Sequence, residues 1–182
     1  YVDTGAMYRA LTLFVSRRGV DLKDEGMVVE TLLEQKPKVE LKVPSEEQKD
    51  GRLCTVLLND EDVSWKVRTE EVSNGVSVIT QYGGVRDLIT PLARKIAMSQ
   101  GVVMEGRDIT SVVLPEANLK IYMDADAMER ATRRHKELLS RGEDITLEQV
   151  HADLVERDER DSRRNIAPLK KVPGAWILDT TK

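Results

Sequence analysis

Residues 156–165 read ERDERDSRRN and hold four arginines interleaved with carboxylates. If residues 147–164 form a helix, then Arg157, Asp161 and Arg164 lie on one face, at positions i, i+4 and i+7. Two guanidinium groups separated by about two turns, with a carboxylate between them, suit a ligand that carries several oxyanions. Phosphate fits because the guanidinium fork donates two hydrogen bonds at once. The plainer interpretation of the same charges is a solvated helix with ion pairs between successive turns.

Other arginines follow the ends of predicted strands. Arg9 comes after DTGAMY, Arg107 lies in EGRD, and Arg133 and Arg134 lie on a predicted helix after DAD. In parallel α/β sheets, ligands bind beyond the carboxyl ends of the strands. We therefore expect these arginines to converge on one crevice that takes an anionic substrate.

The composition argues against several classes of protein. The chain of 182 residues carries 28 basic and 32 acidic residues, a net charge of −4, so the arginine cluster is not part of a generally basic surface. The single cysteine, Cys54, forms no internal disulfide, and Cys and His do not occur at metal-ligand spacing. We expect a cytoplasmic protein with no nucleic-acid partner and no membrane partner.

Short apolar runs alternate with helical patterns, as is typical of a parallel α/β sheet. The strand-like runs are YV, GVVM, LKIYM and AWIL, and the predicted helices cover residues 6–18, 85–100 and 127–141. Residues 37–83 break this alternation, because KVELKV, RLCTVLLN and the turn NDED indicate an inserted hairpin. The charged segment 143–170 is predicted to form a helical hairpin over the site.

Several motifs, in order along the chain, resemble the bacterial cytidylate kinases, which phosphorylate CMP and dCMP from ATP. They are YVDTGAMYRA, RTEEVSNGVS, VMEGRDIT, LKIYMDAD, ERDERDSRRNIAPL and LDTT. The resemblance implies a P-loop-type parallel sheet flanked by helices, with a small inserted nucleotide-monophosphate-binding domain and a helical lid. The core would be partial and span 1–36, 84–149 and 167–182, the insert 37–83 and the lid 150–166.

The resemblance also implies roles for single residues. Arg9, Arg107, Arg157 and Arg164 would hold the CMP phosphate, Thr4 and Asp161 would lie near phosphate and sugar, Ser77, Arg86 and Asp108 would recognise cytosine, and Arg133 and Arg134 would approach ATP. The catalytic residues would be Arg107, Arg157 and Arg164. ATP and Mg²⁺ are the implied cofactors and a monomer is expected. The ligand of the metal stays open, because Asp124 either binds magnesium or belongs to a DAD motif that caps the next helix.

The chain departs from the family pattern in four places. One is its end at Lys182, directly after DTT, where the family continues into a last helix. No G-x-x-x-x-G-K-[ST] phosphate loop occurs, although the family carries one just upstream of the DTGAMYR motif. We expect this sequence to be part of a longer one and not to be catalytically competent by itself; the alternatives are a non-catalytic nucleotide-binding module and an arginine-rich RNA binder. In addition, Thr110 and Ser111 follow GRDI where Gly-Thr is usual, and QYGGVR lacks a proline, which leaves the direction of Arg86 open.

Overall fold

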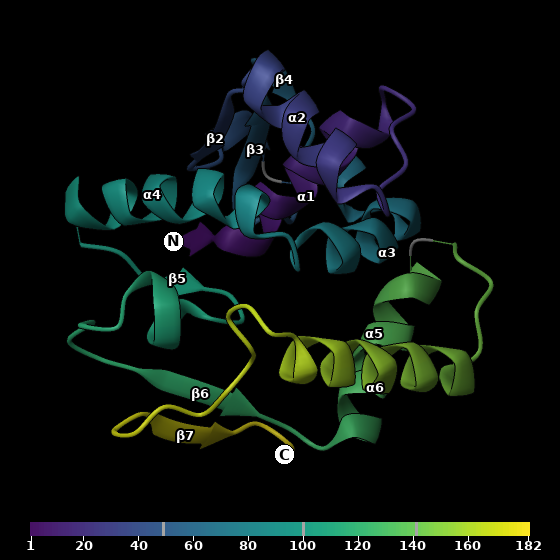
Figure 1. The fold of residues 1–182 in the computed structure, drawn as a ribbon. Coiled ribbons are helices and arrows are strands. Elements are labelled where there is room, and N and C mark those ends of the chain that lie inside the picture. The colour runs from purple at the N-terminus through teal and green to yellow at the C-terminus, as the bar shows by residue number, and fades with distance from the viewer. Residues whose placement is uncertain (49, 100, 141) are drawn as a thin grey trace. The chain divides into compact units, whose positions relative to one another are not determined.

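The computed structural model describes residues 1–48, 50–99, 101–140 and 142–182, which fold into two compact units, Tyr1–Ile109 and Thr110–Lys182 (Figure 1). Each unit has its own hydrophobic cluster. The elements of the two units are therefore taken in turn.

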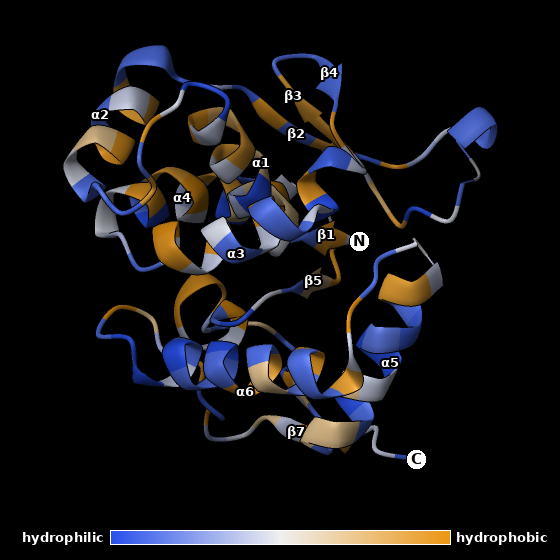
Figure 2. Ribbon diagram, turned by 90° about the vertical axis from the view of Figure 1, so that its right-hand side faces the viewer, coloured by the Kyte–Doolittle hydropathy of each residue, from blue (hydrophilic) through white to orange (hydrophobic). Residues whose placement is uncertain are grey.

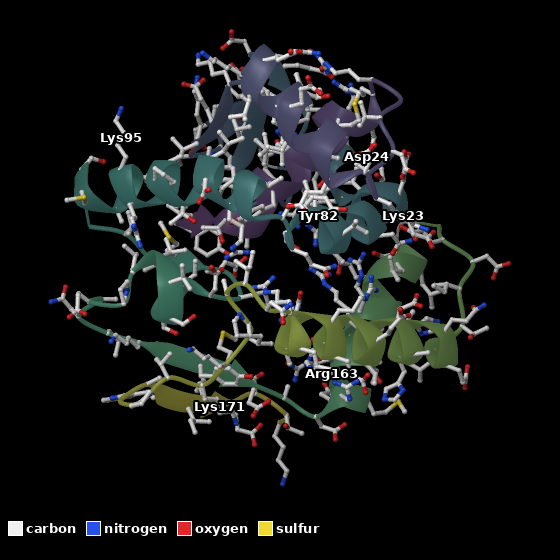
Figure 3. The ribbon with its side chains drawn as sticks, in the orientation of Figure 1. Lys23, Asp24, Tyr82, Lys95, Arg163 and Lys171 are labelled. Carbon is white, nitrogen blue, oxygen red and sulfur yellow. The ribbon has the colours of Figure 1, made fainter. Side chains whose placement is uncertain are left out.

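The first unit is built around α1 (Thr4–Ser16), a helix that is apolar on most sides. Asp3 begins it, because its side chain accepts a hydrogen bond from the backbone N–H of Ala6 at 3.0 Å. The cluster around α1 includes residues of α2 (Glu25–Gln35), α3 (Glu70–Ile79) and α4 (Gly83–Ser99). Tyr82, labelled in Figure 3, donates its hydroxyl to the carbonyl of Leu22 at 2.9 Å and so fixes the connection between α3 and α4.

Two parallel strands lie at the start of α1. β1 (Val2–Asp3) pairs with β5 (Met104–Glu105), with Val2 opposite Met104 and Asp3 opposite Glu105. A single π-helical turn, Ile109–Val113, follows β5. This pairing brings the DTG motif and the EGRD motif to the same edge of the first unit.

The inserted hairpin is confirmed. β2 (Val39–Lys42), β3 (Thr55–Leu58) and β4 (Glu61–Asp62) form an antiparallel sheet, and the short helices Glu46–Gln48 and Lys66–Arg68 flank β3 and β4 in the chain. Asn59 and Asp60 make the tight turn between β3 and β4 with φ values of 49° and 67°, which Asn and Asp tolerate better than most residues.

The second unit combines a parallel strand pair with two packed helices. β6 (Ile121–Asp124) pairs with β7 (Trp176–Asp179), while α5 (Ala127–Ser140) packs against α6 (Leu147–Arg163) through Ala131, Leu138 and Val150. Thr146 and Gln149 form a capping box that begins α6. In Figure 2, α6 is mostly blue, as expected of a helix that buries a narrow stripe.

The three helices predicted over 6–18, 85–100 and 127–141 are confirmed, apart from residues 100 and 141, which lie outside the described residues. The parallel pairing of the four predicted strands is confirmed as well, with one pair in each unit. The helical hairpin predicted over 143–170 is wrong. This segment holds only α6, whose packing partner is α5. Beyond Arg164 the chain cannot continue as a helix, because Ala167 has a φ of 50° and Pro168 lacks a backbone donor.

Candidate functional site

Two of the three predicted cytosine-recognition residues form a buried ion pair. Arg86 of α4 and Asp108, which follows β5, are 5% and 4% exposed, and Nη2 of Arg86 contacts Oδ2 of Asp108. Nη1 of Arg86 donates to the carbonyl of Thr80 at 3.1 Å. Burial of one charge without the other would be costly, so each side chain fixes the other in place. We call Arg86 and Asp108 the base-reading pair, after the role that the family resemblance predicts for them.

The backbone around α3 and α4 favours the position of Arg86. Thr80 is the C-cap of α3, where the partial negative charge of the helix end attracts a cation. In the first turn of α4, a Cβ on Gly84 would lie 2.8 Å from Cγ1 of Val29 on α2, so glycine allows the two helices to approach. The QYGGVR departure therefore has a packing reason, and the direction that it left open is settled: Arg86 points to Asp108.

One face of α3 carries the predicted residue Ser77 and contacts a second predicted residue, Arg9. Nη1 of Arg9 donates to the hydroxyl of Ser73 at 3.1 Å, and Ser77, which is buried, follows Ser73 by four residues on the same face. Sequence reasoning missed Ser73. Its spacing of four residues from Ser77 was the available signal, although no helix was predicted over these residues.

The start of α1 contacts the EGRD loop. The hydroxyl of Thr4 donates to the carbonyl of Glu105 at 2.8 Å, and a Cβ on Gly106 would lie only 2.4 Å from Oγ1 of Thr4. Arg107 is exposed on the next position of the loop. Arg68, which sequence reasoning also missed, lies beside the same helix start, with Nη2 3.9 Å from Oδ2 of Asp3. Its position as the first residue of the RTEEVSNGVS motif was the only signal.

In the second unit, the predicted face of α6 is confirmed. Arg157 and Asp161 lie one turn apart on the helix, and Arg164 is its C-cap. Nη1 of Arg164 lies 3.6 Å from Oδ1 of Asp161, and its Nε donates to the carbonyl of Ala167 at 2.6 Å. Asp161 and Arg164 are both buried. Convergence of this face with the arginines of the first unit stays a prediction.

The two arginines expected near ATP make contacts within the second unit. Nε of Arg133 donates to Glu129 at 2.9 Å, and its Nη2 contacts the carbonyl of Thr180. Nη1 of Arg134 donates to Glu137 at 2.8 Å. Any anion that binds either guanidinium would have to share it with, or take it from, these partners.

The carboxylates of the DAD motif are engaged as well. Asp124 accepts a hydrogen bond from Nζ of Lys171 at 2.8 Å, which lowers the pKa of Asp124 and raises the pKa of Lys171. The carboxylate of Asp126 accepts from the backbone N–H groups of Met128 and Glu129, so its predicted capping role is confirmed. Within the described ranges, His, Cys, Asp and Glu nowhere form a group of three or more that could hold a metal ion.

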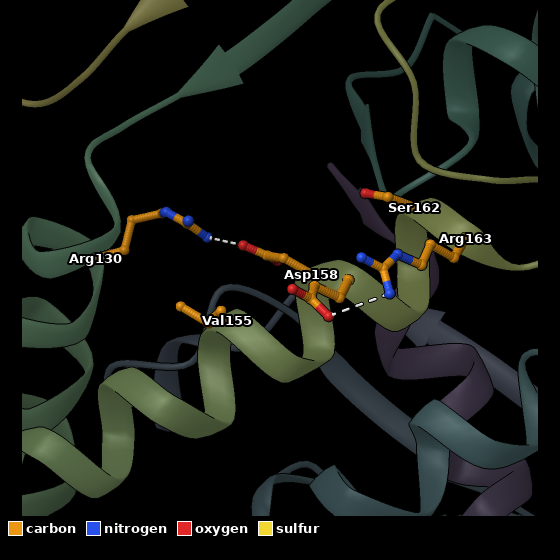
Figure 4. A pocket seen from close by; sticks show the side chains of 6 residues that line it. Arg130, Val155, Asp158, Ser162 and Arg163 are labelled. Atoms are coloured by element: carbon orange, nitrogen blue, oxygen red, sulfur yellow. Dashed lines mark hydrogen bonds and ion pairs between the residues drawn. The ribbon is translucent and has the colours of Figure 1, made fainter.

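A shallow hollow of about 330 Å³ on α5 and α6 contains none of the predicted site residues. It is lined by Arg130, Val155, Asp158, Glu159, Ser162 and Arg163. Figure 4 shows the ion pair that crosses it, with Nη1 of Arg130 at 2.5 Å from Oδ2 of Asp158. Nε of Arg130 also donates to the carbonyl of Ala125, so Arg130 joins the DAD motif to α6.

None of the helices in the described part of the chain has the length and the apolar character that a membrane span requires.

Comparison with known proteins gives a consistent result over the whole chain. The family model described as Cytidylate kinase matches residues 1–182. A curated relative named Cytidylate kinase, from Carboxydothermus hydrogenoformans, is 42% identical over 182 residues, which are 100% of this chain and 78% of the relative. One of the same name from Bacillus licheniformis is also 42% identical, over 100% of this chain and 77% of its own length. A third, from Geobacillus sp., is 44% identical over 181 residues and 77% of its length.

Proposed function

The chain belongs to the cytidylate kinase family, and from this premise we propose that it transfers the terminal phosphoryl group of ATP to CMP or dCMP. The products are ADP and the nucleoside diphosphate. The buried contact between Arg86 and Asp108 is the structural observation that supports this substrate class best.

The base-reading pair suits cytosine for a chemical reason. The carboxylate of Asp108 accepts a hydrogen bond from the exocyclic amine, while Arg86 and Ser77 donate to the ring nitrogen and the carbonyl oxygen. Uracil carries a carbonyl oxygen where cytosine carries the amine, so it would place an acceptor against the carboxylate. Uracil is disfavoured, because two acceptors then face each other and the hydrogen bond that the cytosine amine donates is lost.

The proposed ligands of the CMP phosphate are arginines. In this proposal Arg9, Arg107, Arg157 and Arg164 hold the CMP phosphate. Thr4 and Asp161 lie near the phosphate and the sugar. Catalysis of phosphoryl transfer depends mainly on positioning the two substrates and on cations that stabilise the negative charge of the transferring group. We assign this role to Arg107, Arg157 and Arg164.

ATP is proposed to contact Arg133 and Arg134, which exchange their carboxylate partners for phosphate oxygens. In the proposed division, residues 1–36, 84–149 and 167–182 are kinase core, 37–83 bind the monophosphate and 150–166 form a lid. Closure of a lid excludes water, which would otherwise accept the phosphoryl group. We further propose a monomer in the cytoplasm.

Magnesium is the proposed metal. Protein sites usually bind Mg²⁺ through one or two carboxylates together with substrate phosphates and water, and they seldom enclose it fully. This fits the described residues, which offer Asp124 beside Lys171 and no group of three ligands. Asp124 would then hold the ion, whose chemistry is to neutralise charge on the nucleotide phosphates.

A coupled assay of the full-length protein with CMP, dCMP, UMP and AMP tests the proposal. We expect kcat/KM for CMP and dCMP to exceed that for UMP and AMP by about 100-fold or more, because a site with buried polar groups rejects a substrate that leaves them unpaired. Equal rates with all four monophosphates would refute the substrate class. Nucleotide binding without turnover would instead support the non-catalytic module.

A further inference from the structure

The base-reading pair lies against an aromatic ring from another part of the chain. Tyr8 of α1 is 6% exposed, and its ring centroid lies 5.7 Å from Cζ of Arg86. A guanidinium within about 6 Å of a ring centroid is attracted by the negative ring face. Tyr8 therefore contacts Arg86 by its ring, in addition to packing in the core.

Arg86 thus has three kinds of partner. The carbonyl of Thr80 and the carboxylate of Asp108 accept hydrogen bonds from its two terminal nitrogens. These bonds use the edge of the guanidinium, whereas Tyr8 contributes a ring contact. With these two hydrogen bonds alone, the plane of the guanidinium could still rotate about the line that joins the two acceptors. The ring of Tyr8 opposes that rotation.

Recognition of a base depends on this orientation. An arginine donates usefully only when its N–H groups lie close to the plane of the acceptor that they address. A side chain that reads a base must also be held in place by packing around it. The ring of Tyr8 is one such packing surface for Arg86.

We propose that Tyr8 is a positioning residue of the base-reading site, whose ring holds the guanidinium of Arg86 in the orientation that discriminates cytosine from uracil. The inference rests on the proposed function for the role of Arg86. It goes further because it assigns part of the substrate specificity to a buried residue that acts through Arg86.

The same helix offers a matched control. Phe14 of α1 is 2% exposed, and Cζ of Arg18 lies 3.3 Å from its ring centroid, so it is also a buried ring under an arginine. Arg18 is not among the predicted site residues. Tyr8→Leu and Phe14→Leu therefore remove the same kind of contact from the same helix, and only the first contact involves the site.

The experiment measures kcat/KM for CMP and for UMP in the full-length protein. We expect Tyr8→Leu to lower the CMP to UMP ratio about tenfold, mainly through KM for CMP, because a desolvated cation–π contact is lost. Phe14→Leu is expected to lower thermal stability and to leave the ratio within about twofold, because loss of buried ring volume acts on the core alone. Tyr8→Phe keeps the ring and should recover most of the ratio that Tyr8→Leu loses.

A double-mutant cycle shows whether Tyr8 acts through Arg86. In an Arg86→Ala background, Tyr8→Leu should change the ratio no further, because residues that act through one another are not additive. If Tyr8→Leu does not fold, Tyr8→Met takes its place, because the unbranched, flexible Met side chain adapts better to an irregular gap.

The inference is overturned if Tyr8→Leu keeps the wild-type ratio, or if it lowers the ratio equally with and without Arg86. Failure of the proposed function looks different. In that case the wild-type protein itself shows no preference for CMP, or Arg86→Ala leaves the preference unchanged.

Discussion

Removal of Asp108 is the sharpest test of the buried pair in the first unit. In the Asp108→Ala variant the guanidinium of Arg86 stays buried at 5% exposure without its carboxylate. Loss of one partner of a buried pair costs about 3–5 kcal/mol. Arg86 keeps the carbonyl of Thr80 and the ring of Tyr8, so we expect the lower end, about 3 kcal/mol, in the free energy of unfolding. Asp108→Ala should thus weaken base selectivity and destabilise the first unit as well.

Urea denaturation followed by tryptophan fluorescence measures this cost in the first unit alone. The sequence holds two tryptophans, Trp65 in the first unit and Trp176 in the second. Because Trp176 is exposed, it can be replaced by Phe, and Trp65 then remains as the reporter of the first unit. The matched variant is Arg86→Met with Asp108→Leu, which removes both charges. It should stay within about 1–2 kcal/mol of the parent protein, because no buried charge remains.

Two results would contradict this expectation. The free energy of unfolding of Asp108→Ala could lie within about 1 kcal/mol of that of the parent, or the double variant could be as unstable as the single one. Either result would mean that Arg86 has an alternative partner or that it reaches water in solution. The m-value must agree between the variants for this comparison to hold, since it reports the surface exposed on unfolding.

Three other substitutions test separate features. Gly106→Ala should destabilise the first unit by about 1–3 kcal/mol in the same denaturation assay and reduce activity, because the new Cβ would lie 2.4 Å from Oγ1 of Thr4. Arg17, the C-cap of α1, lowers the pKa of Glu61 from 4.5 to about 2, so the stability from this contact is present above about pH 4.5 and is lost as pH falls toward 2. Glu61→Gln should therefore flatten the pH dependence of Tm over that range. Arg157→Ala should lower kcat by about 100-fold or more with little change in Tm, and Arg163→Ala, on the same helix but exposed, should affect kcat far less. Equal losses in the two arginine variants would contradict the assignment of Arg157.

The sequence by itself determined the features that depend on near neighbours in the chain. Asp3 and Thr146 begin helices because an Asp or Thr side chain caps the N–H groups just beyond it, and Asn59 and Asp60 turn a hairpin because they tolerate positive φ. The face that holds Arg157 and Asp161 followed from helical periodicity. The order of the motifs indicated the family, which the comparisons confirm.

Only the tertiary structure decided which distant side chains meet. Arg86 and Asp108 are 22 residues apart, and no local rule pairs a residue of α4 with a loop after β5. The ring of Tyr8, on a third element, lies against the same guanidinium, although periodicity alone predicts only that Tyr8 is buried. The physical reason is that caps and helix faces are set by interactions within one or two turns, whereas partners of a buried charge are set by how whole elements pack.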